Sequence, residues 1–299
     1  MTRKMVAATL SACFALLLQG CSGGEPVSED RYLASDQFIA TIRDNVDRAA
    51  GLANVVDIDH SRLGHDAGSP MPPAQVLLFS DPEHETRIIQ SNPLAALDLP
   101  FRVLAFEPGL GQKSRVIYNS FDYIASRYGL GGSSVAPLRA AYDDALAAAT
   151  EGIPAPSLAE FADDNMQPDG IVTLDSPYDF EQTVARVRAA IEAQDDTVYF
   201  GTVDFQANAA GLGVDIPASY MILFGGPGPG GKAMAKAPTL GLDGFCQKFL
   251  IWEDRDGSIH LSFNDLLELA DRQQVPKSLA LRVIDFRLGR TFRKALAED

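Results

Sequence analysis

The feature that most constrains the fold is an internal repeat with a nearly constant spacing. Residues 75–79 read Gln-Val-Leu-Leu-Phe, and residues 220–224, 145 positions later, read Tyr-Met-Ile-Leu-Phe. Segments 103–107 and 249–253 also match, with a shift of one residue. Single residues at the spacing of 145 are Pro93 and Pro238, Leu97 and Leu242, Asp98 and Asp243, Tyr118 and Phe263, Asn119 and Asn264, and Arg127 and Arg272. A constant offset with small slips indicates a duplication, so we predict two copies of one folding unit.

The second copy has the clearer pattern of secondary structure. Ser176 is expected to begin a helix as its N-cap, with Pro177 in the first turn and Asp179 completing a capping box. The expected elements are strands over 171–174, 197–204, 220–225, 247–253 and 258–263, a helix with the apolar stripe Phe180, Val184, Val187 and Ile191, a short helix over 232–236, and two C-terminal helices. This order predicts an α+β fold, in which each copy is a two-layer unit with a mostly antiparallel sheet and helices on one face.

The first twenty residues have the pattern of an export signal. Arg3 and Lys4 precede an uncharged, almost wholly apolar run over residues 5–18, which is shorter than the roughly 20 apolar residues that span a bilayer. Residues 18–21 read Leu-Gln-Gly-Cys and resemble the bacterial lipobox, in which the cysteine receives lipid and becomes the new N-terminus. Ser22 follows Cys21, which by resemblance to enterobacterial lipoproteins favours the outer membrane. We therefore expect a lipid on Cys21 and a place in the cell envelope, facing the periplasm.

These patterns divide the chain into five parts. They are a signal peptide over 1–20, a polar tether over 21–31, a first α+β repeat over 32–150, a proline-containing linker over 151–169 and a second α+β repeat over 170–299.

The charge and cysteine content exclude some classes of protein. Without residues 1–20 the chain has 23 basic and 40 acidic residues, and such an excess of negative charge argues against binding to nucleic acid or to anionic lipid surfaces. Cys13 leaves with the signal and Cys21 carries lipid, so Cys246 has no partner and no disulfide is expected. Cys246 lies in an apolar run, where a single cysteine is usually a buried small residue.

The chain resembles the family called domain of unknown function 302. In the second copy the resemblance rests on Ser176-Pro177-Tyr178, Ile222-Leu223-Phe224-Gly225, Leu242-Asp243, Leu250-Ile251-Trp252-Glu253 and Phe263-Asn264-Asp265. In the first copy it rests on Ile58-Asp59-His60, Leu77-Leu78-Phe79, Asn92-Pro93-Leu94-Ala95, Leu97-Asp98-Leu99-Pro100 and Tyr118-Asn119. The resemblance implies small α+β units that associate in pairs, so that two copies in one chain form an internal pseudo-dimer. It implies no catalytic residues.

A glycine-rich segment over 226–233 has the spacing of a phosphate-binding loop, with Lys232 after two glycines. Ala233 stands where a hydroxyl would hold magnesium, and Pro227 and Pro229 lack the backbone N–H groups that such a loop uses. We expect a surface turn here, rather than a nucleotide site or an anion site at the start of the helix.

Histidines and carboxylates in the first copy form the other candidate site. Asp59-His60 and His65-Asp66, with Glu83-His84-Glu85 nearby, provide groups for acid–base chemistry or for a metal held by His60 and His65. The second copy has Phe205 in place of His60, so a buried core histidine is the other interpretation.

Asn119 and Asn264 occupy matching places where a strand leads into a helix. An asparagine there is typical of an N-cap, and a groove that binds a ligand is the alternative. His260 is expected to be a solvated surface residue.

We expect no cofactor, and we favour a non-enzymatic envelope lipoprotein that binds a small molecule or an envelope protein between its two copies. The alternative is an enzyme or metal protein that uses His60, with Asp59 and Asn119 as further catalytic candidates. Substitution of His60 by alanine abolishes turnover if this alternative holds, and lowers stability if His60 belongs to the core.

The lipid anchor gives the first testable prediction. Replacing Cys21 with serine removes the acylated thiol, so the protein should move from the membrane fraction to the soluble periplasmic fraction. Mass spectrometry of the N-terminal peptide should find acyl chains on the wild-type cysteine only. Acyl-free wild-type protein, or equal membrane retention of both forms, would contradict the prediction.

Overall fold

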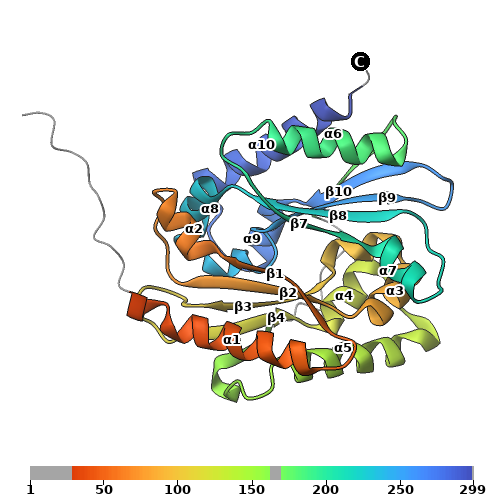
Figure 1. The fold of residues 1–299 in the computed structure, drawn as a ribbon. Coiled ribbons are helices and arrows are strands. Elements are labelled where there is room, and N and C mark those ends of the chain that lie inside the picture. Colours follow the sequence, from red (N-terminus) through yellow and green to blue (C-terminus); the bar gives the residue numbers. More distant parts are fainter. Residues whose placement is uncertain (1–28, 162–169, 298–299) are drawn as a thin grey trace, which may run out of the picture.

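The computed structural model describes residues 29–161 and 170–297. The expected signal, Cys21 and the end of the expected linker lie outside these residues. The described part is built from two five-stranded sheets and their helices, one sheet from each half of the chain (Figure 1). This confirms the predicted α+β fold with two tandem two-layer units.

The two copies share one succession of long helices and strands, from α1 to α5 and from α6 to α10, and differ in the short elements and in one outer strand. The first copy contains η1 Glu29–Arg31, α1 Leu33–Arg48, β1 Ala53–Asp59, α2 His60–Asp66, β2 Ala74–Ser80, α3 Pro82–Ser91, η2 Pro93–Asp98, β3 Phe101–Phe106, β4 Arg115–Asn119, α4 Phe121–Tyr128, η3 Gly132–Ser134, α5 Val135–Ala149, η4 Ala155–Ser157 and β5 Leu158–Phe161. The second contains β6 Ile171–Ser176, α6 Phe180–Glu192, β7 Val198–Asp204, α7 Phe205–Gly211, β8 Ser219–Gly225, α8 Pro227–Met234, η5 Pro238–Gly241, β9 Gln247–Glu253, β10 Ile259–Asn264, α9 Leu266–Arg272 and α10 Leu279–Ala295.

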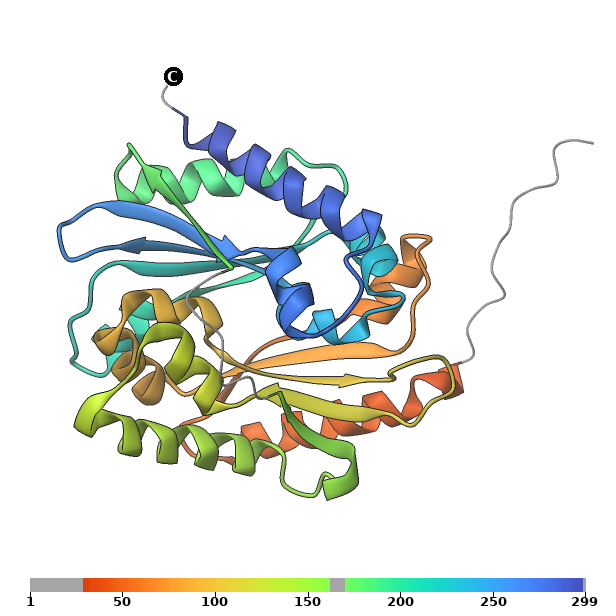
Figure 2. The same ribbon diagram turned by 180° about the vertical axis from the view of Figure 1, so that it is seen from behind.

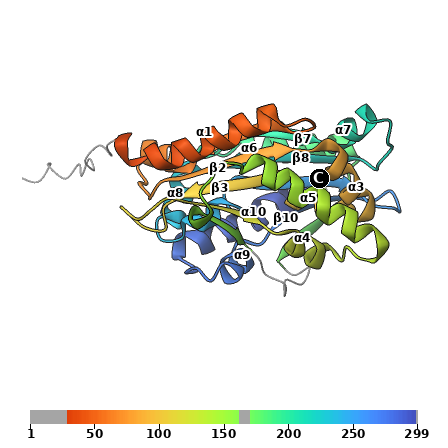
Figure 3. The same ribbon diagram turned by 90° about the horizontal axis from the view of Figure 1, so that it is seen from below.

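The long helices cover the outer faces of the sheets, and the inner faces lie toward each other. Helices α1 and α5 contact each other over one sheet, while α6 and α10 lie side by side over the other (Figures 1 and 3). Between the sheets, α2 packs on α8, α3 packs on α7, and the short helices η2 and η5 each contact strands of the opposite copy. The order of layers therefore places one buried interface between the two copies.

The two copies share local details that a common origin explains. Strands β1 and β7 each have a bulge at the same place, and Asp59 and Asp204 each cap the helix that follows. The strand orders are β1-β2-β3-β4 and β7-β8-β9-β10, with every neighbouring pair antiparallel.

The outer strand next to β4 or β10 has a different source in each copy. Strand β5 follows α5 in the chain and pairs parallel to β4, whereas β6 precedes α6 and pairs antiparallel to β10. Equivalent edges of the two sheets are thus covered by opposite ends of the repeated unit.

Two local sequence predictions were wrong. Helix α6 begins at Phe180 with Asp179 as its N-cap, because Ser176 is the last residue of β6 and its hydroxyl bonds to Thr183. The segment over 226–233 is not a surface turn, since most of it forms α8. Gly231 of this helix lies against Ser69 and Gly64, and a Cβ at Gly231 would stand 2.5 Å from the Ser69 carbonyl oxygen. The glycines therefore permit close packing of α8 on α2.

Within the described ranges, no helix has the length and apolar character needed to cross a membrane.

Candidate functional site

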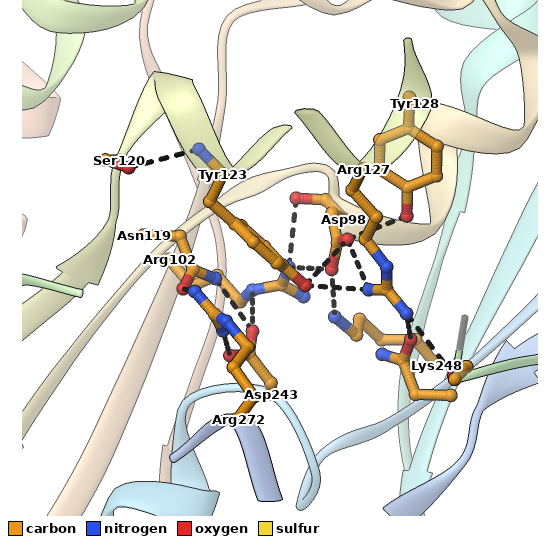
Figure 4. Close-up of polar contacts among 12 residues, drawn as sticks. Asp98, Arg102, Asn119, Ser120, Tyr123, Arg127, Tyr128, Asp243, Lys248 and Arg272 are labelled. Atoms are coloured by element: carbon orange, nitrogen blue, oxygen red, sulfur yellow. Dashed lines mark hydrogen bonds and ion pairs between the residues drawn. The ribbon is translucent and has the colours of Figure 1, made fainter. Parts of the chain in front are cut away.

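A cluster of buried charged and polar side chains lies between the two sheets (Figure 4). It comprises Asp98, Arg102, Asn119, Tyr123, Arg127 and Tyr128 from the first copy, and Asp243, Lys248, Asn264 and Arg272 from the second. We call this set the inter-copy cluster. The side chains of its four cations and two carboxylates are at most 3% exposed.

Equivalent elements position the equivalent residues of each copy. Asp98 ends η2 and Asp243 follows η5, while Asn119 and Asn264 are the last residues of β4 and β10. Arg102 pairs across the sheet with Leu78, and Lys248 with Leu223, so these two cations also correspond. Arg127 and Arg272 lie near the ends of α4 and α9.

Asp98 is surrounded by donors. One carboxylate oxygen accepts from Arg102 at 2.8 Å and lies 3.5 Å from the Lys248 ammonium of the other copy. The other oxygen accepts from Arg127 at 2.6 Å and from the hydroxyls of Tyr123 and Tyr128 at 3.2 and 2.7 Å. Burial alone would raise the pKa of Asp98, but Arg127 and Arg102 lower it more strongly, so the pKa lies well below its usual range.

Asp243 has the equivalent place in the second copy. It accepts from Arg272 at 3.0 Å and from the amide of Asn119 at 2.9 Å, and Arg102 Nε lies 3.2 Å from it. Both Asn119 and Arg102 come from the first copy, so each carboxylate is bound by groups of both copies.

The asparagines complete a pseudo-symmetric pair of cross-links. Arg272 donates to the Asn119 side-chain oxygen at 2.8 Å, and Arg127 donates to the Asn264 side-chain oxygen at 2.8 Å. The predicted N-cap role of these asparagines is therefore wrong. Ser120 and Asp265, one residue later, cap α4 and α9, which leaves the asparagine side chains free to enter the interface.

The cluster has more positive than negative charge. It contains four cations and two carboxylates. The buried donor atoms without a hydrogen-bond acceptor among the described residues include Arg102 Nη1, Arg127 Nε and Asn264 Nδ2. A buried charge without compensation and a buried donor without an acceptor are both costly. This arrangement suits a small anion.

A small cavity at the interface contains His60. Its lining includes Leu63 of α2, residues 225–227, 230 and 231 of the second copy, Phe245 and Cys246. Its volume is about 20 Å³, which is room for about one water molecule. Burial raises the pKa of the Cys246 thiol to about 12, and the positive charge of Arg102 opposes this rise. Cys246 is buried, as predicted.

The structure does not gather the histidines into one site. His60 Nε2 donates to the Gly241 carbonyl at 3.2 Å, and burial lowers the pKa of His60 to about 4. His65 is partly exposed and lies near Asp66, whereas His84 is buried against Phe101. Among residues 29–161 and 170–297 no group of three or more potential ligands could hold a metal ion.

His260 has more partners than the sequence predicted. Its ring nitrogens lie 2.9 Å from Asp175 and 3.0 Å from Asp254, and the ring packs on Trp252 with centroids 4.8 Å apart. The expected solvated position is wrong, because the turn after β9 brings Asp254 back over the strand.

Sequence reasoning missed most of the inter-copy cluster, although the signal was present. Asp98, Arg127 and their counterparts recur at the repeat spacing. Charged residues that persist in both copies at interior positions of the pattern would have indicated a shared buried site.

The comparisons with known proteins give two kinds of match. A family model described as a domain of unknown function, DUF302, matches residues 29–149 and 172–292. Proteins named fluoride-specific ion channel FluC 1 from Brucella suis and Brucella abortus, and FluC 2 from Brucella melitensis, are each 35% identical over 106 residues. The match covers 36% of this chain, and the chain spans about two fifths of the length of these curated relatives, at 41%, 38% and 38%.

A solved structure also matches the chain. It is described as an uncharacterized conserved protein DUF302 from Bacillus stearothermophilus, with a TM-score of 0.36 and 12% sequence identity. The alignment covers 43% of this chain and 96% of that one.

Removal of one carboxylate from the inter-copy cluster should strongly lower the stability of the folded protein. Asp243→Asn leaves Arg102 and Arg272 short of a buried counter-charge, so the free energy of unfolding should fall by about 3–5 kcal/mol. Urea unfolding at pH 7 measures this. The same change at exposed Asp215 is the control and should have little effect. Equal stability of both variants would show that the cluster contributes nothing.

The burial of His60 should make the stability of the protein depend on pH. The pKa of His60 is lowered in the folded state. Below pH 6.5 the unfolded chain therefore binds a proton at His60, while the folded chain stays neutral there until the pH approaches 4. The free energy of unfolding should fall as the pH drops from 6.5 toward 4. His60→Phe introduces the residue of the second copy and should remove about 3 kcal/mol of this fall. Asn208→Ala changes no titratable group, so it is the control and should leave the profile unchanged. An identical acid profile for wild type and His60→Phe would refute the assignment.

Proposed function

The chain belongs to the DUF302 family, in two tandem copies, and from this premise we propose that it is a non-enzymatic envelope lipoprotein that binds a small inorganic anion between its copies. The proposal rests on the surplus of buried positive charge in the inter-copy cluster. Folding removes four cations from water and supplies two carboxylates among the described residues. A bound anion would offset this imbalance.

The orphaned donors support the same conclusion. Asn264 donates nothing to Asp98, although its counterpart Asn119 donates to Asp243. The hydrogen bond from Asn119 to Asp243 therefore has no counterpart at Asn264. An anion accepting from Asn264 Nδ2, or from Arg102 Nη1, would take the place of the missing acceptor.

The interface cavity has no room for an organic ligand, although none of its lining residues belongs to the cluster. A cavity for an organic ligand usually has several hundred cubic ångströms, whereas the cavity lined by His60 and Cys246 has about 20 Å³. The cavity adjoins the cluster along the chain, because Cys246 is followed by Lys248 of the cluster, and Gly241, which accepts from His60, is followed by Asp243.

The names of the curated relatives suggest which anion to try first. Those proteins are called fluoride-specific ion channels, and the share of them that this chain spans is about two fifths. We take fluoride as the first probe, with chloride and bromide beside it.

The location is also part of the proposal. The signal pattern and the lipobox ending at Cys21 support anchoring by lipid to the outer membrane, with the two copies facing the periplasm. A reaction or metal site at His60 has less support, because His60 is buried and neutral near pH 7, and its Nε2 hydrogen is donated to Gly241.

The direct test is the stability of residues 21–299 with Cys21→Ser, measured by urea unfolding in sodium fluoride, chloride, bromide or gluconate at equal ionic strength. Binding to the folded state alone should raise the free energy of unfolding by about 2.7 kcal/mol when the anion is at one hundred times its dissociation constant. Gluconate is too large for the cluster and should give no such increase.

The variant Asn264→Asp tests whether the stabilising halide binds in the inter-copy cluster. Asn264→Asp keeps the oxygen that accepts from Arg127, adds a negative charge and removes the orphaned amide, so the dependence on halide should disappear. Asn208→Asp, outside the cluster, should retain it. Equal stability of the wild type in halide and gluconate would contradict the proposal, and retained dependence in Asn264→Asp would place the anion elsewhere.

A further inference from the structure

The outer face of α10 exposes large apolar side chains in one stripe. Leu279, Val283 and Phe286 are 77%, 57% and 67% exposed, and their spacing places them on one side of the helix. The opposite side packs into the core through Leu281, Leu288 and Phe292. The stripe is therefore additional to the apolar surface that holds α10 in the fold.

Basic residues surround this stripe. Within Leu279–Ala295 there are five basic residues and one acidic residue, in a chain whose net charge is −15. Arg282, Arg290, Arg293 and Lys294 are exposed. The acidic residue, Asp285, is half-buried and accepts a hydrogen bond from the Leu266 backbone.

The matching helix of the first copy provides a comparison inside the same molecule. Helix α5 also lies on the outer face of its sheet, on the opposite side of the molecule from α10 (Figure 2). Its exposed residues are Ala136, Pro137, Ala140, Asp143, Asp144 and Ala147. Packing in the fold therefore does not demand large apolar and basic residues at this place. Helix α6, which lies beside α10, has two glutamates and two arginines, so it adds no net charge.

The net charge of the whole chain argued against anionic lipid surfaces, but the charge of this helix is opposite in sign. We propose that the outer face of α10 binds the surface of a bilayer that contains anionic phospholipid. Helices that lie in a membrane interface combine apolar side chains, which enter the headgroup region, with lysine and arginine, which pair with lipid phosphates. The apolar stripe runs about 10 Å along the helix, and basic side chains continue past it to the end. This contact is independent of the proposed anion site and of the lipid on Cys21.

The charges favour a bilayer over a second copy of the chain. A two-fold dimer through this face would bring the same basic residues of two molecules together around the stripe. Like charges at close range oppose such an interface, whereas an anionic bilayer attracts them.

The test is sedimentation of residues 21–299 with Cys21→Ser, which has no acyl chain, with vesicles of phosphatidylcholine alone or with 30% phosphatidylglycerol as the probe composition. Partitioning should be at least tenfold stronger on the anionic vesicles and should weaken with added salt.

Two double variants of α10 test which side chains make the contact. Arg290→Glu with Arg293→Glu should lower the partitioning at least tenfold, since each charge near the surface contributes roughly fivefold. Val283→Ser with Phe286→Ser should lower it similarly. The control on α5, Ala140→Ser with Ala147→Ser, should match the wild type.

Several results would overturn the proposal. Equal partitioning on both vesicle types, or undiminished partitioning of either α10 variant, would exclude this face as the membrane contact. A dimer in analytical ultracentrifugation that dissociates in Val283→Ser with Phe286→Ser, without vesicle binding, would assign the stripe to a second copy. Circular dichroism and unchanged thermal unfolding confirm that each variant is folded, which its exposed positions favour.

Discussion

Burial of the inter-copy cluster is the constraint on which the rest of the structure depends. Two carboxylates and four cations leave water when the sheets come together, and each loses far more solvation than a surface ion would. Contacts from the opposite copy complete their coordination, such as Asn119 on Asp243 and Arg127 on Asn264. Neither sheet alone provides a full set of partners, so the duplicated halves act as one folded body rather than as two linked domains.

The copies share their architecture and differ in residues of the cluster and of the outer surface. Tyr123 and Tyr128, which donate to Asp98, correspond to Glu268 and Gln273 in the second copy. Asp98 consequently has more donors than Asp243, and the second half of the cluster carries the orphaned amide of Asn264. The outer surfaces have diverged as well, since α5 is acidic and small where α10 is basic and apolar. A fused pair permits such asymmetry, which a symmetric homodimer forbids.

The sequence predicted the elements better than it predicted their interface. The repeat spacing, the apolar periodicities and the turn before β10 sufficed for two α+β units, because these signals are local or recur along the chain. The role of Asn119 was misassigned because Asn119 and Ser120 are both good caps, and only the direction of β4 shows which side chain faces the helix. The glycines of α8 were read as a turn because their partners, Ser69 and Gly64, lie over 150 residues earlier and no local pattern reveals that contact.

The measurement that tests the central claim most directly is diffraction from crystals grown in sodium bromide, collected at the bromine absorption edge. The account predicts an anomalous peak inside the inter-copy cluster, in contact with Arg102 Nη1 or Asn264 Nδ2, and no peak there in Asn264→Asp. A cluster that stays free of bromide while surface sites fill would contradict it. The surplus charge would then be a structural feature alone, without a bound anion.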